Sequence, residues 1–158
     1  MATIATIINE LQTIATAFTS VNSFYFEEIA YINDDVSKTY PAILVNSRSV
    51  DYTIDSFENN YLPRKKNFTL QIYFLDTYKQ AEKDTTDKQT KYGALEVIAD
   101  QYLAEIKRRT LESYLDFEFN IGASGFQVDD LHNDKLNQIV YNASFTVKNK
   151  CTTGTFSY

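Results

Sequence analysis

Apolar residues recur every three or four positions in two stretches of the chain, residues 4–19 and residues 90–112. Thr3 precedes the first stretch and suits a helix N-cap. This spacing places the apolar side chains on one side of a helix, so the sequence predicts two amphipathic helices. The residues that carry the pattern are Ile4, Ile7, Ile8, Leu11, Ile14, Ala15, Phe18 and, further on, Tyr92, Leu95, Ile98, Ala99, Tyr102, Leu103 and Ile106.

Five other stretches have the composition or the alternation of β-strands. Residues 24–32 are aromatic and β-branched, and residues 41–50 open with Pro41, which fits the start of a strand. The remaining stretches alternate apolar and polar residues, which gives each strand one buried face. They predict a sheet that needs a cover on one side only. These alternating stretches are residues 68–74, 115–121 and 138–148.

The segments between these elements are polar. Residues 53–66 are predicted to form a long loop. Residues 77–91 hold four lysines and three acidic residues without apolar periodicity, which predicts an exposed linker or lid. Residues 122–135 contain two glycines and an acidic stretch, as expected of a connection. Residues 152–158 are predicted to be a C-terminal tail.

The predicted order is helix, three strands, helix, two strands. No strand–helix–strand unit repeats, so a doubly wound parallel sheet is not expected. The sequence instead predicts an α+β fold, with a mainly antiparallel sheet of four to five strands and both helices packed on one face. With 158 residues, the chain has the size of one domain, which we place at residues 1–151.

Charge argues against tight binding to nucleic acid. The chain has 15 Lys and Arg against 21 Asp and Glu, a net charge of −6, whereas phosphate binding needs a clustered positive face. Two short basic runs, residues 64–66 and 107–109, are interpreted as a solvated loop and a helix end. No apolar run is long enough to cross a membrane, so no membrane association is expected.

Candidate catalytic and metal-binding residues are few. His132 is the only histidine and lies among Asp129, Asp130 and Asp134, but this spacing matches no known cation loop and is interpreted as an acidic turn. Cys151 is the only cysteine, follows a predicted strand and lacks a nucleophile elbow around it. The four glycines form no phosphate-binding loop. We therefore predict no catalytic residue, no metal and no cofactor; a small enzyme that uses His132 stays as an alternative.

The chain is rich in aromatic residues, with 12 Tyr and 11 Phe. Tyrosine and phenylalanine are enriched at protein interfaces, while at least half of these side chains are needed for the core. We predict interface residues in the 53–66 segment and at the C-terminus. For Phe57 and Tyr61, local packing within the loop is the alternative. The candidates are Phe57, Tyr61, Arg64, Lys65, Phe156 and Tyr158.

The order of these features resembles the tail-terminator and head–tail connector proteins of tailed bacteriophages. The resemblance rests on the N-terminal amphipathic helix, the Tyr40-Pro41-Ala42-Ile43-Leu44 strand, the long hairpin and the strand of residues 68–76. It continues through the helix of residues 94–106 and the Asn133-Asp134-Lys135-Leu136 entry into the last strand and Cys151. It covers nearly the whole chain.

The resemblance implies a structural protein of the virion neck or tail, assembled in the bacterial cytoplasm. Such proteins form cyclic homo-oligomers, often hexamers or dodecamers, that contact portal, neck or tail proteins and leave a lumen. DNA would be passing cargo, and a net negative protein lets it slide past. A monomeric adaptor that binds another protein through its aromatic residues is the alternative function.

Overall fold

The computed structural model describes residues 3–26, 38–54, 61–77, 85–112, 117–120, 127–128 and 136–152. These residues form two helices and six strands. The helices are α1 (Ile4–Thr16) and α2 (Thr85–Leu111), and the strands are β1 (Ser23–Phe26), β2 (Ala42–Ile54), β3 (Tyr61–Thr77), β4 (Glu118–Asn120), β5 (Gln127–Val128) and β6 (Leu136–Thr152).

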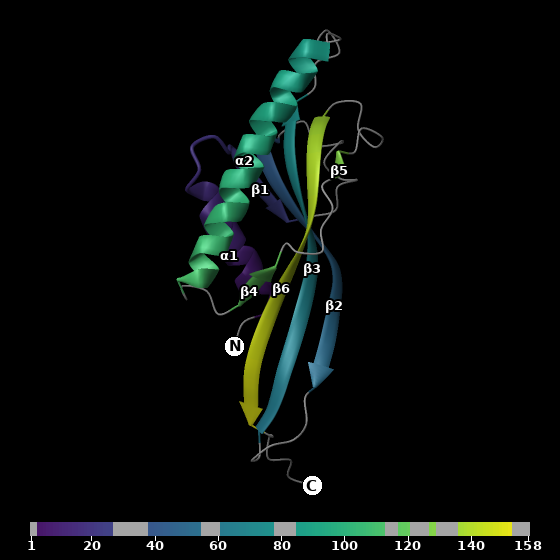
Figure 1. Cartoon of the computed structure of the whole chain (residues 1–158). Helices are drawn as coiled ribbons and strands as arrows, with labels where there is room; N and C mark the ends of the chain where they lie inside the picture. The colour runs from purple at the N-terminus through teal and green to yellow at the C-terminus, as the bar shows by residue number, and fades with distance from the viewer. Residues whose placement is uncertain are drawn as a thin grey trace.

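The strands form one sheet in the order β1-β2-β3-β6-β4, with the short β5 paired to β6. β1 runs parallel to β2, and the other pairs are antiparallel. Both helices lie on the same side of the sheet (Figure 1). The predicted α+β fold with a mainly antiparallel sheet is confirmed, although the sheet is mixed and includes a parallel edge strand.

α1 begins with the predicted cap. Thr3 and Thr6 form a reciprocal capping box, in which the Thr3 hydroxyl accepts from the Thr6 amide and the Thr6 hydroxyl accepts from the Thr3 amide. The helix buries Ile7, Leu11 and Ile14. Its isoleucine and threonine residues are weak helix formers, so this apolar face against the sheet stabilises the helix.

The main core lies between the helices and the sheet. α1 and α2 contribute their apolar faces, and β2, β3 and β6 contribute every second residue. The largest fully buried side chains include Tyr102, Phe74, Phe119 and Phe145. The two apolar stripes and the alternating strands of the sequence therefore meet in one core, as predicted.

The opposite face of the sheet is also buried in its upper part, which corrects the expectation of a one-sided sheet. Leu44 and Leu75 are fully buried there, and Tyr73 is 6% exposed. Tyr25 and Tyr40 pack against this second cluster. The sequence explains the burial of this second face, because Ala42–Val45 and Ile72–Leu75 are unbroken apolar runs, which are typical of strands buried on both faces.

Two predicted connections are wrong at their ends. The loop predicted over residues 53–66 is strand at both ends, since β2 runs to Ile54 and β3 begins at Tyr61. The linker predicted over residues 77–91 is helical from Thr85 onward. A helix whose later turns pack on a core extends outward easily, because nucleation is the costly step and each further residue adds a hydrogen bond.

The last third of the chain follows the predicted alternation with different bounds. The strand predicted over residues 115–121 is β4, and the strand predicted over residues 138–148 is the longer β6, which ends at Thr152. The predicted tail therefore starts inside a strand. The prediction missed β5, whose two residues lie in the segment interpreted as a connection. The domain boundary at residue 151 stays a prediction.

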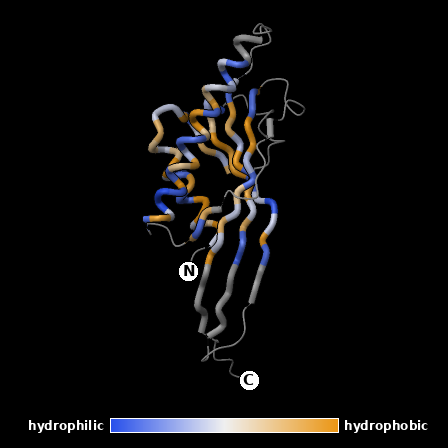
Figure 2. Tube along the Cα trace, in the orientation of Figure 1, coloured by the Kyte–Doolittle hydropathy of each residue, from blue (hydrophilic) through white to orange (hydrophobic). Residues whose placement is uncertain are grey.

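Three strands run on past the helices to form a narrow extension, which we call the arm. The arm comprises residues 51–54 of β2, 61–67 of β3 and 146–152 of β6, which are paired in register. It projects from the end of the body near β4 (Figure 1). Hydrophobic colouring is concentrated in the body, and the strands show mixed colours where they leave it (Figure 2).

Candidate functional site

The structure places three of the six predicted interface residues in the arm. Tyr61 is the first residue of β3, and Arg64 and Lys65 follow in the same strand. Phe57, Phe156 and Tyr158 lie outside the described residues. The prediction of a loop around Arg64 and Lys65 is wrong in its local structure, because both residues are paired on two sides, with β2 and with β6.

The register of the arm brings together basic residues from two distant parts of the chain. Lys65 of β3 is the direct partner of Lys148 of β6, and Pro63 pairs with Lys150. Residues opposite each other in an antiparallel pair share one face of the sheet. Alternation along β3 and β6 therefore assigns Lys65, Lys148 and Lys150 to the face away from the helices, and Arg64 and Lys66 to the helix side.

The arm differs in charge from the rest of the protein. Its strands hold five Lys and Arg and one acidic residue, Asp51, a net charge of +4. The remaining ten basic and 20 acidic residues give −10. The six residues that join β2 to β3 lie outside the described part and include Asp55 and Glu58; counting them with the arm leaves +2 against −8. Either count gives the two regions opposite signs.

The two outer strands of the sheet differ in their protection. At the β4 edge, the Lys107 ammonium donates a hydrogen bond to the Phe119 carbonyl oxygen at 3.0 Å. Lys107 belongs to α2, so a side chain from the helix contacts the backbone of this edge strand. At the other edge, β1 carries Phe26, whose side chain is 51% exposed.

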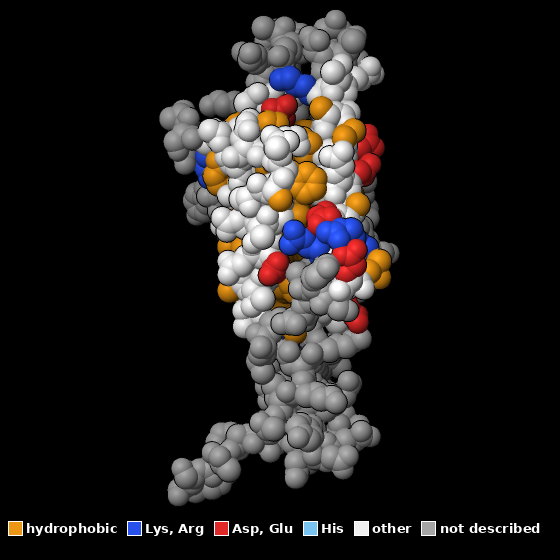
Figure 3. All heavy atoms as spheres, turned by 90° about the vertical axis from the view of Figure 1, so that its left-hand side faces the viewer, with side chains coloured by type: hydrophobic (Ala, Val, Ile, Leu, Met, Phe, Trp, Pro, Cys, Tyr) orange, Lys and Arg blue, Asp and Glu red, His pale blue; other side chains and the backbone are white. Residues whose placement is uncertain are grey.

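The basic run at the end of α2 is engaged in ion pairs within the helix. Arg108 pairs with Glu105 at 2.7 Å and with Glu112, and Arg109 pairs with Glu105 at 2.9 Å. The two guanidinium groups lower the pKa of Glu105 to about 2. Figure 3 shows a cluster of mixed charge on this face, surrounded mostly by uncharged atoms. The run therefore lies at the end of a helix, as predicted.

A second electrostatic feature lies on α2 further from this cluster. Glu96 and Asp100 are exposed like charges one helical turn apart. Burial raises the pKa of the Tyr141 hydroxyl, and both carboxylates raise it further because they oppose the tyrosinate. The two carboxylates therefore add negative charge beside Tyr141.

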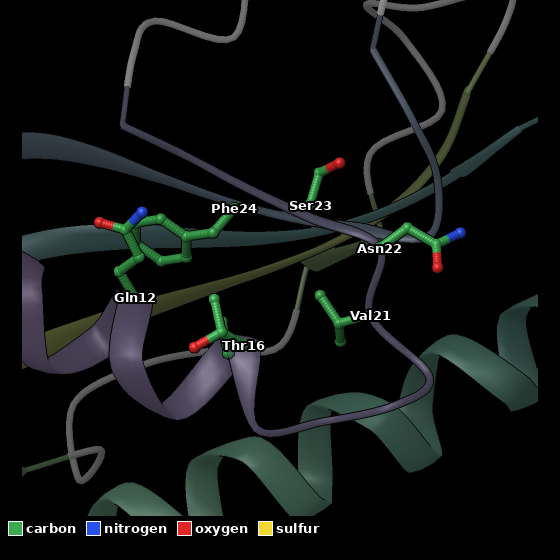
Figure 4. A pocket seen from close by; sticks show the side chains of 7 residues that line it. Gln12, Thr16, Val21, Asn22, Ser23 and Phe24 are labelled. Atoms are coloured by element: carbon green, nitrogen blue, oxygen red, sulfur yellow. The ribbon is translucent and has the colours of Figure 1, made fainter.

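A small pocket lies where α1 meets β1. Its volume is about 200 Å³. Figure 4 shows Gln12 and Thr16 on α1 facing the segment that carries Val21 and Phe24. The residues that line the pocket are amides, hydroxyls and apolar groups, with no acid, base or thiol among them. The hydroxyls of Thr16 and Ser23 could act as nucleophiles only with a base to activate them, and no lining residue supplies one.

The candidate catalytic residues do not converge in the described part of the chain. Cys151 lies in β6 opposite Leu62 of β3. His132 and the aspartates around it lie outside the described residues. Among the residues that are described, no group of three or more His, Cys, Asp or Glu is placed to hold a metal ion.

No family model matches this chain, and no curated protein matches its sequence. The described helices include none that is long and apolar enough to cross a membrane.

Sequence reasoning found the basic residues of the arm but not the strand pairing that brings them together. Arg64, Lys65 and Lys66 stood out as a run, whereas Lys148 and Lys150 belonged to a predicted strand and its end. Their meeting depends on the pairing of β3 with β6, which is a contact between distant residues. The signal that was available was the pair of lysines at alternate positions, 148 and 150, which a strand places on one face.

Proposed function

We propose that this protein is a structural component of a tailed-bacteriophage virion that forms a homo-oligomeric ring in the neck or tail. The single observation that carries the proposal is the arm, in which β2, β3 and β6 run on past the helices as a paired extension (Figure 1). The sequence resemblance to tail-terminator and head–tail connector proteins supports the same function.

The arm supports a ring for a physical reason. An extension of paired strands outside the main core gives a subunit reach without adding to its own core. When such an element contacts a different surface of the next copy, the contact is head-to-tail, and a head-to-tail contact closes into a ring if its rotation closes. The ring would have six or twelve copies, contact portal, neck or tail proteins, and leave a lumen for DNA. The net charge of −6 would disfavour retention of the DNA backbone.

The mass of the purified protein in solution tests the proposal. Light scattering at several protein concentrations should give a discrete hexamer or dodecamer. A chain that stays monomeric at all concentrations, and that binds a single partner at one-to-one stoichiometry, contradicts the ring. That outcome would favour the adaptor function instead.

A further inference from the structure

We propose that the outward face of α2 packs against the same face of a second copy of this chain, with the two helices antiparallel. The inference goes beyond the proposed ring, because this contact relates two copies by a two-fold axis and so joins copies in pairs.

The outward face of α2 is the first step of the argument. An uncharged stripe runs along it, on the side of the helix opposite the residues buried in the core, and every member is exposed. The side chain of Val97, in the middle of the stripe, is 55% exposed. The stripe comprises Ala94, Val97, Gln101, Ala104 and, at the end of the helix, Leu111.

The charges beside this stripe are the second step. Asp100 and Lys107 lie one heptad apart on the same flank, and both are exposed. The Lys107 ammonium donates to the Phe119 carbonyl oxygen at 3.0 Å, and an ammonium has further N–H donors with which it can meet a carboxylate. An antiparallel copy of α2 presents the same two charges in the reverse order, so each copy offers the complement of the other.

The register of the two helices follows from these charges. When Gln101 lies opposite Ala104 of the second copy, Asp100 of each copy lies beside Lys107 of the other. A shift by one heptad in either direction sets Asp100 against Asp100 or Lys107 against Lys107, and like charges repel. The face is therefore complementary to itself in one register, which is why we assign it to a second copy rather than to a different protein.

The opposite flank of the stripe agrees with this register. Lys91 and Glu112 lie on that flank, and the register brings Lys91 of each copy near Glu112 of the other. The remaining carboxylate there, Glu105, is held by Arg108 and Arg109 of its own helix.

The sizes of the side chains also suit close packing. Ala104 is small and allows the two helices to approach, and Val97 would lie against the aliphatic stem of Arg108 of the second copy. Ala94 and Leu111 form the outermost layers of the contact. Residues at such a rim contribute little to affinity, so the energy of the contact resides in its centre.

Charge reversal tests the contact, with the mass in solution measured by sedimentation velocity at several protein concentrations. The variant Asp100→Lys sets two lysines opposite each other, so the mass of the assembled species should fall to half or less. The variant Lys107→Glu sets two carboxylates opposite each other and should do the same. The matched control Asp51→Lys makes the first charge change on an exposed residue of the arm and should leave the mass unchanged.

Mixing the two variants tests the antiparallel register. In a mixed pair, the lysine introduced by Asp100→Lys faces the glutamate introduced by Lys107→Glu, and the native Asp100 faces the native Lys107. An equal mixture should therefore assemble to the mass of the wild type although neither variant assembles alone. This recovery would also show that both variants are folded.

Three outcomes would overturn the inference. If Asp100→Lys assembles like the wild type, the α2 contact is wrong while the ring stands. If neither variant assembles and their mixture stays dissociated, Asp100 does not meet Lys107 across the contact. A wild type that is monomeric at every concentration removes the α2 contact and the ring together.

Discussion

The Tyr102 hydroxyl of α2 donates a hydrogen bond to the Leu11 carbonyl oxygen of α1 at 2.8 Å, and both residues are fully buried. The ring of Tyr102 also meets Phe18 and Phe74 edge-on, with centroids 6.1 Å and 5.7 Å away. One side chain therefore joins the two helices to each other and to the sheet. A buried tyrosine hydroxyl needs such a partner.

Replacing Tyr102 by phenylalanine should lower the free energy of unfolding by about 1 kcal/mol, the net value of one buried hydrogen bond. Replacing it by alanine should cost about 3–5 kcal/mol, because the cavity left among Leu11, Phe18 and Phe74 adds to the lost burial. Urea denaturation followed by circular dichroism measures both changes. Equal stabilities of the phenylalanine variant and the wild type would show that the hydroxyl does not stabilise the contact.

The same residue predicts a loss of stability at alkaline pH. Burial raises the pKa of Tyr102 well above its usual value of 10. The folded state therefore favours the neutral phenol. The contribution of Tyr102 to the free energy of unfolding is complete below pH 10 and is lost as the pH rises through the pKa that Tyr102 has in the folded state. The stability difference between the wild type and the Tyr102→Phe variant should shrink above pH 10, since the variant lacks this titration. A difference that stays constant up to pH 11.5 in urea titrations would contradict the prediction.

Phe145 at the centre of β6 is expected to be the most sensitive position near β4. It stacks on Phe119 with a centroid distance of 5.0 Å and meets Phe117 edge-on at 5.6 Å. Phe145→Ala should lower the free energy of unfolding by about 3–5 kcal/mol. The matched control is Leu111→Ala, because Leu111 is 72% exposed at the end of α2 and should change stability by about 0.5 kcal/mol at most. Comparable losses in the two variants would show that the stack adds nothing.

The core could be predicted from the sequence because it follows local periodicity. The stripe that contains Leu11 and the stripe that contains Tyr102 each required only the spacing of apolar residues within one helix. Phe119 and Phe145 likewise stood at alternate positions of predicted strands. In each case the information lies within a short window of the chain, and the structure confirms it.

The arm and the ends of the elements could not be predicted in the same way. Residues 61–66 hold three apolar residues followed by three basic ones, without alternation, so their strand structure comes from pairing with β6, a partner far away in the sequence. The first turns of α2 lack an apolar face and extend from a packed helix. β5 has two residues, which is too short for any periodicity to appear. The Lys65–Lys148 pair depends on the register of two long strands, which a shift by one residue would abolish.

The pKa of Glu105 predicts a small loss of stability in acid. Arg108 and Arg109 lower this pKa from 4.5 to about 2. The contribution of the ionised Glu105 carboxylate to the free energy of unfolding is present above pH 4.5 and is lost as the pH falls through about 2. The Arg108 side chain is 50% exposed, so water screens the pair and Glu105→Gln should cost only about 0.5 kcal/mol at pH 7. The difference from the wild type should fade between pH 4.5 and 2, and also in 1 M salt at pH 7. If the stability difference between Glu105→Gln and the wild type changes with neither pH nor salt, it arises from packing rather than from the ion pairs.

Lys107 is expected to hold the β4 edge of the sheet in place. Its ammonium donates to the Phe119 carbonyl oxygen at 3.0 Å, and β4 has only three residues paired with β6. The variant Lys107→Met keeps the apolar stem and removes the donor, so β4 should open more often. A bond worth about 1 kcal/mol corresponds to roughly fivefold faster hydrogen exchange of the amides of residues 118–120, measured by mass spectrometry.

The matched control for that edge is Lys91→Met at the other end of the described sheet. Lys91 donates from its ammonium to the Thr77 carbonyl oxygen at 2.7 Å, so its loss removes a similar bond from the end of β3 and should leave exchange in β4 unchanged. If both variants accelerate exchange in β4 equally, the effect is a general loss of stability rather than the opening of one edge. If neither does, the strand is held by Phe117 and Phe119 packed in the core, both of which are buried. A local effect of Lys107→Met alone would show that the Lys107 side chain holds this edge of the sheet in place.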